Sequence, residues 1–200
     1  MLINHKLKMI YIANPKTGSS TVRVWFIDKL GGELVDRKDS RLPHSPGHDP
    51  FITPEIKGEY FLFTTIRCPF RLTVSRYLYT RRHSRHPVYH ITSKFGFKDS
   101  LRRVMDEGRW PSQTHFLGKC TAKIDLFVRN EDGLFEQLSK LPGWSNIEPC
   151  RVNASPYPKP WHEFYDEETE QWVREYYAND FEQLDYPNTV HLARKQYPEI

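Results

Sequence analysis

The sequence predicts a three-layer α/β domain with a central, mainly parallel β-sheet flanked by helices, and three observations support this prediction. Short apolar runs rich in β-forming residues alternate along the chain with amphipathic segments of helical period. Two of these runs, 9–13 and 59–66, are nearly continuously apolar, as is typical of strands buried on both faces of a parallel sheet. The length of 200 residues suits a single domain over residues 1–200. Strands and helices that alternate in this way join parallel strands through right-handed crossovers.

The first elements in order are a strand, a loop and a helix. Met9 to Ala13 is the strand, which Pro15 cannot extend. The helix begins at Ser19 or Ser20 and stops at Gly31-Gly32. Its apolar stripe consists of Val22, Trp25, Phe26 and Leu30. The loop between strand and helix is small, polar and contains a glycine, so its amides and the positive end of the helix dipole predict an anion-binding site.

Three further strands are expected after this helix. A short one lies at 33–35, and longer ones lie at 59–66 and 124–129. The segments 36–54 and 150–160 are rich in proline and are expected to be loops. A long loop inside a compact domain is often functional.

Helices are expected to alternate with these strands. One begins at Pro69, because proline suits the first position of a helix, and two others cover 98–108 and 132–141. Asp166 caps a further helix whose first turn is acidic, as the helix dipole favours. The segment 110–118 matches neither the helical nor the strand period.

Charge is distributed unevenly along the chain, although the net charge is only +4. No acidic residue lies between Glu59 and Asp99, whereas that stretch contains eight lysines and arginines. The stretch 163–185 holds nine acidic residues against one arginine. This asymmetry indicates an anionic ligand or partner for the basic stretch, or a merely solvated surface.

Hydropathy and the number and spacing of the cysteines indicate the cellular compartment and whether a metal site is expected. No run approaches the length of a membrane span, and the apolar segment after Lys8 is too short for the core of a signal peptide. We therefore expect a cytoplasmic protein without a membrane span. Cys68, Cys120 and Cys150 are odd in number and lack Cys-x-x-Cys spacing, which argues against a disulfide framework and a zinc site. No bound metal is expected.

The loop after the first strand reads Pro15-Lys16-Thr17-Gly18-Ser19-Ser20-Thr21. A nucleotide triphosphatase loop requires Gly-Lys-Ser/Thr in that order, whereas here Lys16 precedes Gly18. The strand, loop and helix still make the predicted domain P-loop-like. The loop resembles the 5′-phosphosulfate loop of sulfotransferases that use 3′-phosphoadenosine 5′-phosphosulfate (PAPS), in particular the carbohydrate branch with its heparan and chondroitin type (sulfotransferase-2-type) enzymes. The simpler alternative is an ordinary turn whose serines and threonines only cap the helix.

A second stretch, Arg67 to Tyr77, resembles the 3′-phosphate motif of the same family. Arg67 at the carboxyl end of a strand can contact phosphate oxygens with two N–H groups, and Ser75 on the next helix can donate its hydroxyl to the same phosphate. Cys68 occupies a position where the family usually has an acidic residue or asparagine. This difference leaves the phosphate donors in place but puts the family's turn geometry in question at this position. The resemblance makes Arg71 structural, with a surface ion pair or a solvated side chain as alternatives.

Two further matches follow in the same order along the chain. A strand that ends in Arg-x-Glu, here Arg129 and Glu131, resembles one that braces the site, although a plain surface pair also explains these residues. Asn153 and Ser155 resemble the family's C-terminal loop, where they would help to hold the nucleotide, unless they only form a turn.

Over residues 9–186 the resemblance implies a PAPS-dependent sulfotransferase that requires no metal. The sulfuryl group would move to an acceptor hydroxyl by in-line displacement, with adenosine 3′,5′-bisphosphate as the product. Lys16 would act on the bridging oxygen, and a histidine of the loop 36–54 would be the base. His48 fits the register of the family better than His44, which is explained as an exposed loop residue. The implied nucleotide-binding residues are Lys16, Thr17, Gly18, Ser19, Ser20, Thr21, Arg67 and Ser75.

The acceptor is expected to be a carbohydrate. The basic run from Arg81 to His86 would suit an anionic glycan, unless it is only a solvated helix end. The rival among enzymes is a P-loop nucleotide or small-molecule kinase, against which the missing Gly-Lys-Ser/Thr argues. The rival from another class is a basic nucleic-acid-binding module with Tyr77, Tyr79 and Tyr89 among the basic residues. We favour no nucleic-acid partner, because a hydrophobic core explains aromatic residues at helical spacing; a non-catalytic binder of adenosine bisphosphate is a further alternative.

Overall fold

The computed structural model describes residues 1–35, 52–141 and 157–198. Contacts divide the chain into two units, each of which combines two separate stretches of the sequence. The sheet unit comprises Met1–Ile66 and Gln113–Asn153, and the helical unit comprises Arg67–Ser112 and Ala154–Ile200.

The sheet unit contains a five-stranded mixed sheet in the order β3-β1-β2-β4-β5. Its strands are β1 (Leu2–Asn4), β2 (Met9–Ile12), β3 (Glu33–Leu34), β4 (Phe61–Ile66) and β5 (Leu126–Arg129). β2, β4 and β5 are parallel, whereas β1 pairs antiparallel with β2 and with β3. The α/β class and the four expected strands are therefore confirmed. The sheet carries an antiparallel edge that was not expected, because β1 is too short to show a period in the sequence.

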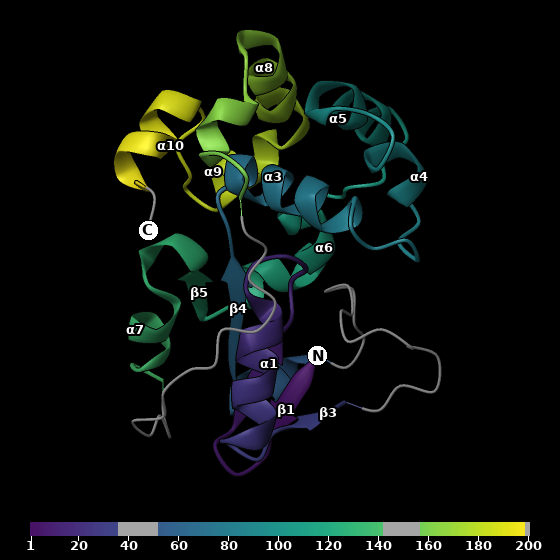
Figure 1. The fold of residues 1–200 in the computed structure, drawn as a ribbon. Helices are drawn as coiled ribbons and strands as arrows, with labels where there is room; N and C mark the ends of the chain where they lie inside the picture. The colour runs from purple at the N-terminus through teal and green to yellow at the C-terminus, as the bar shows by residue number, and fades with distance from the viewer. Residues whose placement is uncertain (36–51, 142–156, 199–200) are drawn as a thin grey trace. The chain divides into compact units, whose positions relative to one another are not determined.

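Alternate residues of β2 face opposite sides of the sheet, and different helices cover the two sides. Tyr11 packs in a cluster with Phe26 on α1 (Ser19–Asp28) and Leu138 on α7 (Leu134–Leu138), and α1 is drawn in front of the sheet in Figure 1. Ile10 packs in a second cluster with Leu117 on α6 (Gln113–Leu117). That side also carries α2 (Pro54–Glu59) and the 3₁₀ helix η1 (Gly118–Lys123). Helices therefore flank the sheet on both faces, as expected.

In the helical unit, α3 (Pro69–Thr80) is the central helix, and Figure 1 shows it among its neighbours. All of its residues are buried except Arg71 and Tyr79, which are half-buried. The elements that pack against it are α4 (Tyr89–Thr92), α5 (Phe97–Asp106), η3 (Trp161–Phe164) and α8 (Glu167–Tyr176). The Tyr165 hydroxyl donates to the Phe70 carbonyl at 2.7 Å, and the two rings meet edge to face at 5.3 Å. α9 (Ala178–Gln183) and α10 (Val190–Gln196) follow α8.

The expected helices are present, with one shortened. Pro69 begins α3, and α5 and α8 lie where the sequence predicts them. The ambiguous segment 110–118 contains α6. The helix expected at 132–141 is shorter, because the 3₁₀ turn η2 (Asn130–Asp132) and Gly133, with φ of 76°, precede α7. Across the described ranges, no helix is both long enough and apolar enough to cross a membrane.

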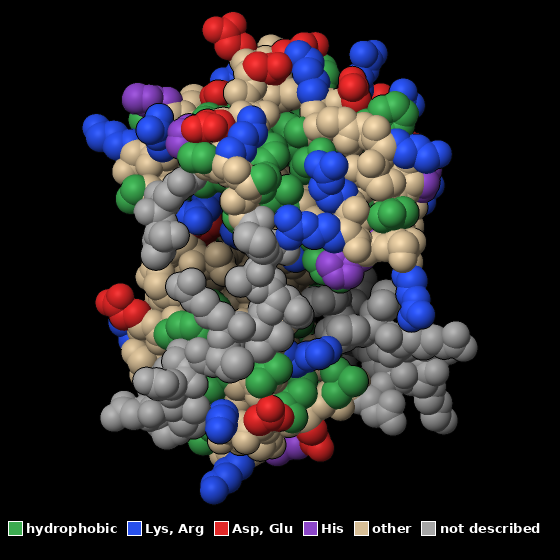
Figure 2. Space-filling view, in the orientation of Figure 1, with side chains coloured by type: hydrophobic (Ala, Val, Ile, Leu, Met, Phe, Trp, Pro, Cys, Tyr) green, Lys and Arg blue, Asp and Glu red, His purple; other side chains and the backbone are tan. Residues whose placement is uncertain are grey.

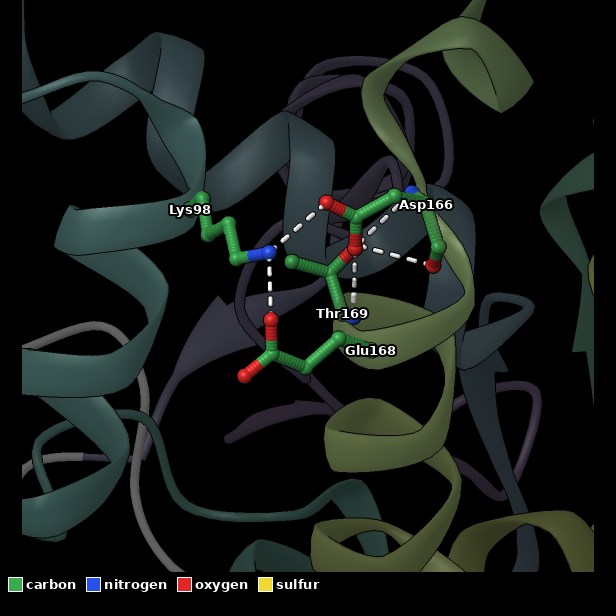
Figure 3. A network of polar contacts seen from close by, with 4 residues as sticks. All are labelled: Lys98, Asp166, Glu168 and Thr169. Carbon is green, nitrogen blue, oxygen red and sulfur yellow. Dashed lines mark hydrogen bonds and ion pairs between the residues drawn. The ribbon is translucent and has the colours of Figure 1, made fainter.

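The N-terminus of α8 is fixed by a capping box, as the sequence predicts (Figure 3). The Asp166 carboxylate accepts the Thr169 backbone N–H at 2.8 Å, and the Thr169 hydroxyl accepts the Asp166 N–H at 2.9 Å. Lys98 on α5 pairs with Asp166 at 2.9 Å and with Glu168 at 2.5 Å. These contacts, led by the bond from the Thr169 N–H, lower the pKa of Asp166 to about 2.

Candidate functional site

The loop between β2 and α1, predicted to bind an anion, contains two residues in the left-handed backbone conformation. Lys16 and Gly18 adopt positive φ values of 65° and 91°. Residues with positive φ between ordinary ones turn successive amides toward a common point, which is how backbone nests bind anions. A non-glycine residue such as Lys16 rarely adopts this conformation, and such residues often occur at functional sites.

The helix that follows offers amides and no competing negative charge. Gly18 is the N-cap of α1, no side chain caps the helix, and its first turn contains no acidic residue. Ser19 and Ser20 are its first residues, so their N–H groups have no acceptor within the helix. The Thr21 N–H, by contrast, donates to the Gly18 carbonyl at 3.1 Å. The amides that remain for an anion therefore centre on Gly18, Ser19 and Ser20 rather than on the whole of 17–21.

Hydroxyl groups buried beneath the loop attach it to β4. The Thr17 hydroxyl donates to the Asn14 carbonyl at 2.8 Å and lies 2.6 Å from the Thr65 hydroxyl, which in turn lies 2.8 Å from the Tyr11 hydroxyl. Burial raises the pKa of Tyr11 well above its ordinary value, so its hydroxyl stays protonated. Thr17 is 0% exposed, so its side chain supports the loop from beneath.

Asn130 fixes the loop from the end of β5. Its Nδ2 donates to the Thr17 carbonyl at 3.2 Å. A Cβ added to Gly18 would lie 2.8 Å from the same nitrogen and 3.3 Å from Leu134 Cδ2. Because β2, β4 and β5 are parallel, their carboxyl ends share one edge of the sheet, the edge at which ligands of open α/β sheets bind.

Asn130 and Thr65 were not among the residues selected from the sequence. The only signal for either is its place at or next to the carboxyl end of a predicted parallel strand. Gln137 on α7 was not selected from the sequence either. Its side chain accepts the Arg129 N–H at 2.9 Å and donates to the Arg129 carbonyl at 2.7 Å. Arg129 is half-buried and Glu131 is 7% exposed, and their bracing role stays a prediction.

The residues expected to bind a 3′-phosphate lie in the helical unit. Arg67 follows the last residue of β4 in the sequence, and its Nη2 donates to the Tyr157 hydroxyl at 3.1 Å. Ser75 lies on α3 and is 6% exposed. Cys68 is buried and is the N-cap of α3, and its carbonyl accepts the Leu72 N–H at 2.8 Å, so the cysteine does not prevent the helix from starting there.

Several predicted residues lie outside the described ranges. His48 and His44 belong to 36–51, and Asn153 and Ser155 belong to 142–156, so their roles stay predictions. Of the basic run, Arg81 donates to the Tyr77 hydroxyl at 2.6 Å, and His83 stacks on Tyr79 with ring centroids 3.8 Å apart. In the part of the chain that the structure describes, no group of three or more His, Cys, Asp or Glu side chains could hold a metal ion.

Comparison of the chain with protein-family models, with curated proteins and with solved structures finds no match.

Proposed function

We propose that this chain is a sulfotransferase that moves the sulfuryl group of PAPS to a hydroxyl of a carbohydrate acceptor. The observation that carries the proposal is the turn after β2, where Lys16 and Gly18 have positive φ and α1 begins with uncapped amides. The 5′-phosphosulfate of PAPS is an anion, and this loop supplies backbone amides and a lysine that could bind it. The first turn of α1 contains no acidic residue that would repel it. The sequence resemblance supplies the choice of PAPS over other anions.

In the proposed reaction an acceptor oxygen attacks the sulfur atom in line with the bond to the leaving group. The bond between sulfur and the bridging oxygen of the 5′-phosphate breaks, and adenosine 3′,5′-bisphosphate leaves with the electron pair. Lys16 stabilises the charge that develops on the bridging oxygen, while the amides of Gly18, Ser19 and Ser20 hold the phosphate. His48 takes the proton of the acceptor hydroxyl. The lysine and the amides supply positive charge, so the proposal needs no metal ion.

Transfer of label from PAPS tests the proposal. Purified protein is incubated with labelled PAPS and a panel of glycans, small alcohols and tyrosine peptides, and labelled acceptors are counted. We expect a glycan to be labelled, and we expect Lys16→Met to lower turnover by about 100-fold or more, since one preorganised donor is typically worth about 3 kcal/mol of barrier height.

Lys29→Met is the matched control, because Lys29 is the exposed C-cap of the same helix. That variant should turn over at the normal rate. Phosphate transfer from ATP and magnesium, with no sulfuryl transfer to any acceptor, would contradict the proposal and favour the kinase alternative.

A further inference from the structure

One stripe of α3 is less covered than the rest of that helix. Arg71 and Tyr79 are its two half-buried residues, and Ser75 lies between them in the sequence. Residues four apart lie on one face of a helix, so these three side chains form a single stripe. Ser75, which is 6% exposed, therefore lies on the same face of α3 as Arg71.

Two of the three guanidinium nitrogens of Arg71 are buried and lack an acceptor among the described residues. Its Nε and Nη1 atoms are shielded from solvent and make no hydrogen bond within the described residues. Arg76 on the same helix is different, because its Nη1 donates to the Pro111 carbonyl at 2.8 Å and to the Tyr177 hydroxyl at 3.1 Å. Buried nitrogens of a cation that lack acceptors are costly, and charged groups of this kind normally pair with a counter-charge. Among the described residues Arg71 forms no ion pair, and with two nitrogens shielded from solvent it is not a fully solvated side chain.

We propose that Arg71 binds the 3′-phosphate of the nucleotide together with Arg67 and Ser75, an inference that rests on the proposed function. Arg71 is four residues after Arg67 and four before Ser75, and helical side chains lean toward the N-terminus of their helix, so Ser75 leans toward Arg71. A phosphate monoester carries close to two negative charges at neutral pH and accepts several hydrogen bonds. Two guanidinium groups and one hydroxyl match this charge and these acceptors.

The proposed contact makes Arg71 a specificity-determining residue. A nucleotide with a 3′-phosphate would satisfy the two buried nitrogens, whereas adenosine 5′-monophosphate would leave them without acceptors. A site discriminates strongly between two ligands when one ligand forms hydrogen bonds with its buried polar groups and the other leaves them without partners.

The test compares two ligands across three proteins by calorimetric titration. Adenosine 3′,5′-bisphosphate and adenosine 5′-monophosphate are titrated into the wild type, Arg71→Met and the control Arg102→Met, which removes an exposed arginine of α5. We expect Arg71→Met to weaken the bisphosphate by about 10- to 100-fold, the loss typical of one charge-assisted contact, and to leave the monophosphate unchanged. Arg102→Met should bind both ligands as the wild type does.

A second variant and a stability measurement separate binding from folding. Arg71→Lys keeps a charge but not the planar group, and should lose bisphosphate affinity to a smaller extent than Arg71→Met. Without ligand, Arg71→Met should melt at the same or a higher temperature, because it removes a buried charge without a partner. Equally weakened binding of both ligands, or a lower melting temperature without a selective loss of bisphosphate binding, would overturn the proposed role of Arg71. Neither result would overturn the proposed function. Failure of the wild type to bind the bisphosphate would overturn the proposed function itself.

Discussion

Gly18 is the position of the loop between β2 and α1 at which an added side chain would be strained. Its φ of +91° is strained for an L-residue, and an added Cβ would come within 2.8 Å of Asn130 Nδ2. We therefore expect Gly18→Ala to destabilise the protein by about 2 kcal/mol or more, because the left-handed backbone alone costs about 1–2 kcal/mol. Urea unfolding measures this loss, and the displaced Asn130 should also weaken adenosine 3′,5′-bisphosphate binding.

Gly58→Ala is the matched control for that variant. Gly58 lies in α2, and a Cβ added there would have no heavy atom within 4 Å. Alanine at this position should be neutral or stabilise by about 0.5 kcal/mol, since glycine is a poor helix former. A Gly18→Ala protein as stable as Gly58→Ala would mean that the loop does not require the left-handed turn.

Sequence reasoning selected the candidate residues of the loop one by one, but it could not select residues that contact the loop from distant parts of the chain. Lys16, Gly18 and Ser19 follow one another in a motif, so a short stretch of sequence is enough to select them. Asn130 contacts Thr17 across more than one hundred positions of the chain, and no local pattern marks such a partner. Arg71 was given a structural role by resemblance, with a surface position as the alternative, because helical spacing tells which residues share a face but not how much of that face is covered.

At the scale of elements, the N-terminus of α8 gives a pH-dependent prediction. The pKa of Asp166 is lowered to about 2, below the value of about 3.9 expected for an unfolded chain. A lowered folded pKa stabilises the fold above the unfolded pKa, and this stabilisation is lost as pH falls from about 4 toward about 2. Because Asp166 is largely exposed, solvent screens the effect, and the cap as a whole is worth about 1 kcal/mol.

Asp166→Asn separates the charge of this residue from its hydrogen bond. Asparagine is an equally good N-cap, so the variant should lose only the attraction to Lys98 and to the helix dipole. Urea unfolding should place it slightly below the wild type at pH 7 and level with it near pH 2, whereas Asp166→Ala should be less stable at both. A constant difference between Asp166→Asn and the wild type over the whole range would contradict the assigned pKa.

Most elements were predictable from the sequence according to their length, although β3, with two residues, was expected and is shorter than β1. β2, β4 and β5 and the helices α1, α3, α5 and α8 are long or apolar enough to show a period or a clear start, and all were expected. β1, with three residues, and α4, with four, were not expected. A strand or helix of this length is too short to show a repeating pattern of apolar residues in the sequence. Tertiary contacts of Leu2 and Ile3 in the core, rather than local preference, place β1 in the sheet.

At the scale of the whole molecule, part of the charge asymmetry is neutralised within the fold. Lys98 from the basic stretch pairs with Asp166 and Glu168 from the acidic one, and in Figure 2 acidic and basic side chains are interspersed over the region of α8. Arg82 and Arg85 are exposed and form no ion pair among the residues that the structure describes. The stretch 81–86 therefore keeps the positive charge that the proposed anionic acceptor would require.

In the proposed mechanism catalysis, unlike binding, also requires a base from residues 36–51, which the structure does not describe, and the sequence gives two candidates for it. His48→Ala should abolish sulfuryl transfer, with a fall of at least about 100-fold in kcat, because a positioned general base typically contributes that much. Affinity for PAPS should stay nearly intact, since Lys16, the amides at Gly18 to Ser20, Arg67 and Ser75 hold the nucleotide in the proposed complex. His44→Ala, in the same loop, is the control and should transfer at the normal rate. Single-turnover kinetics measure the rate of transfer, and PAPS titrations measure the affinity. Normal turnover in His48→Ala with loss of turnover in His44→Ala would make His44 the base. Normal turnover in both variants would mean that neither histidine is the base.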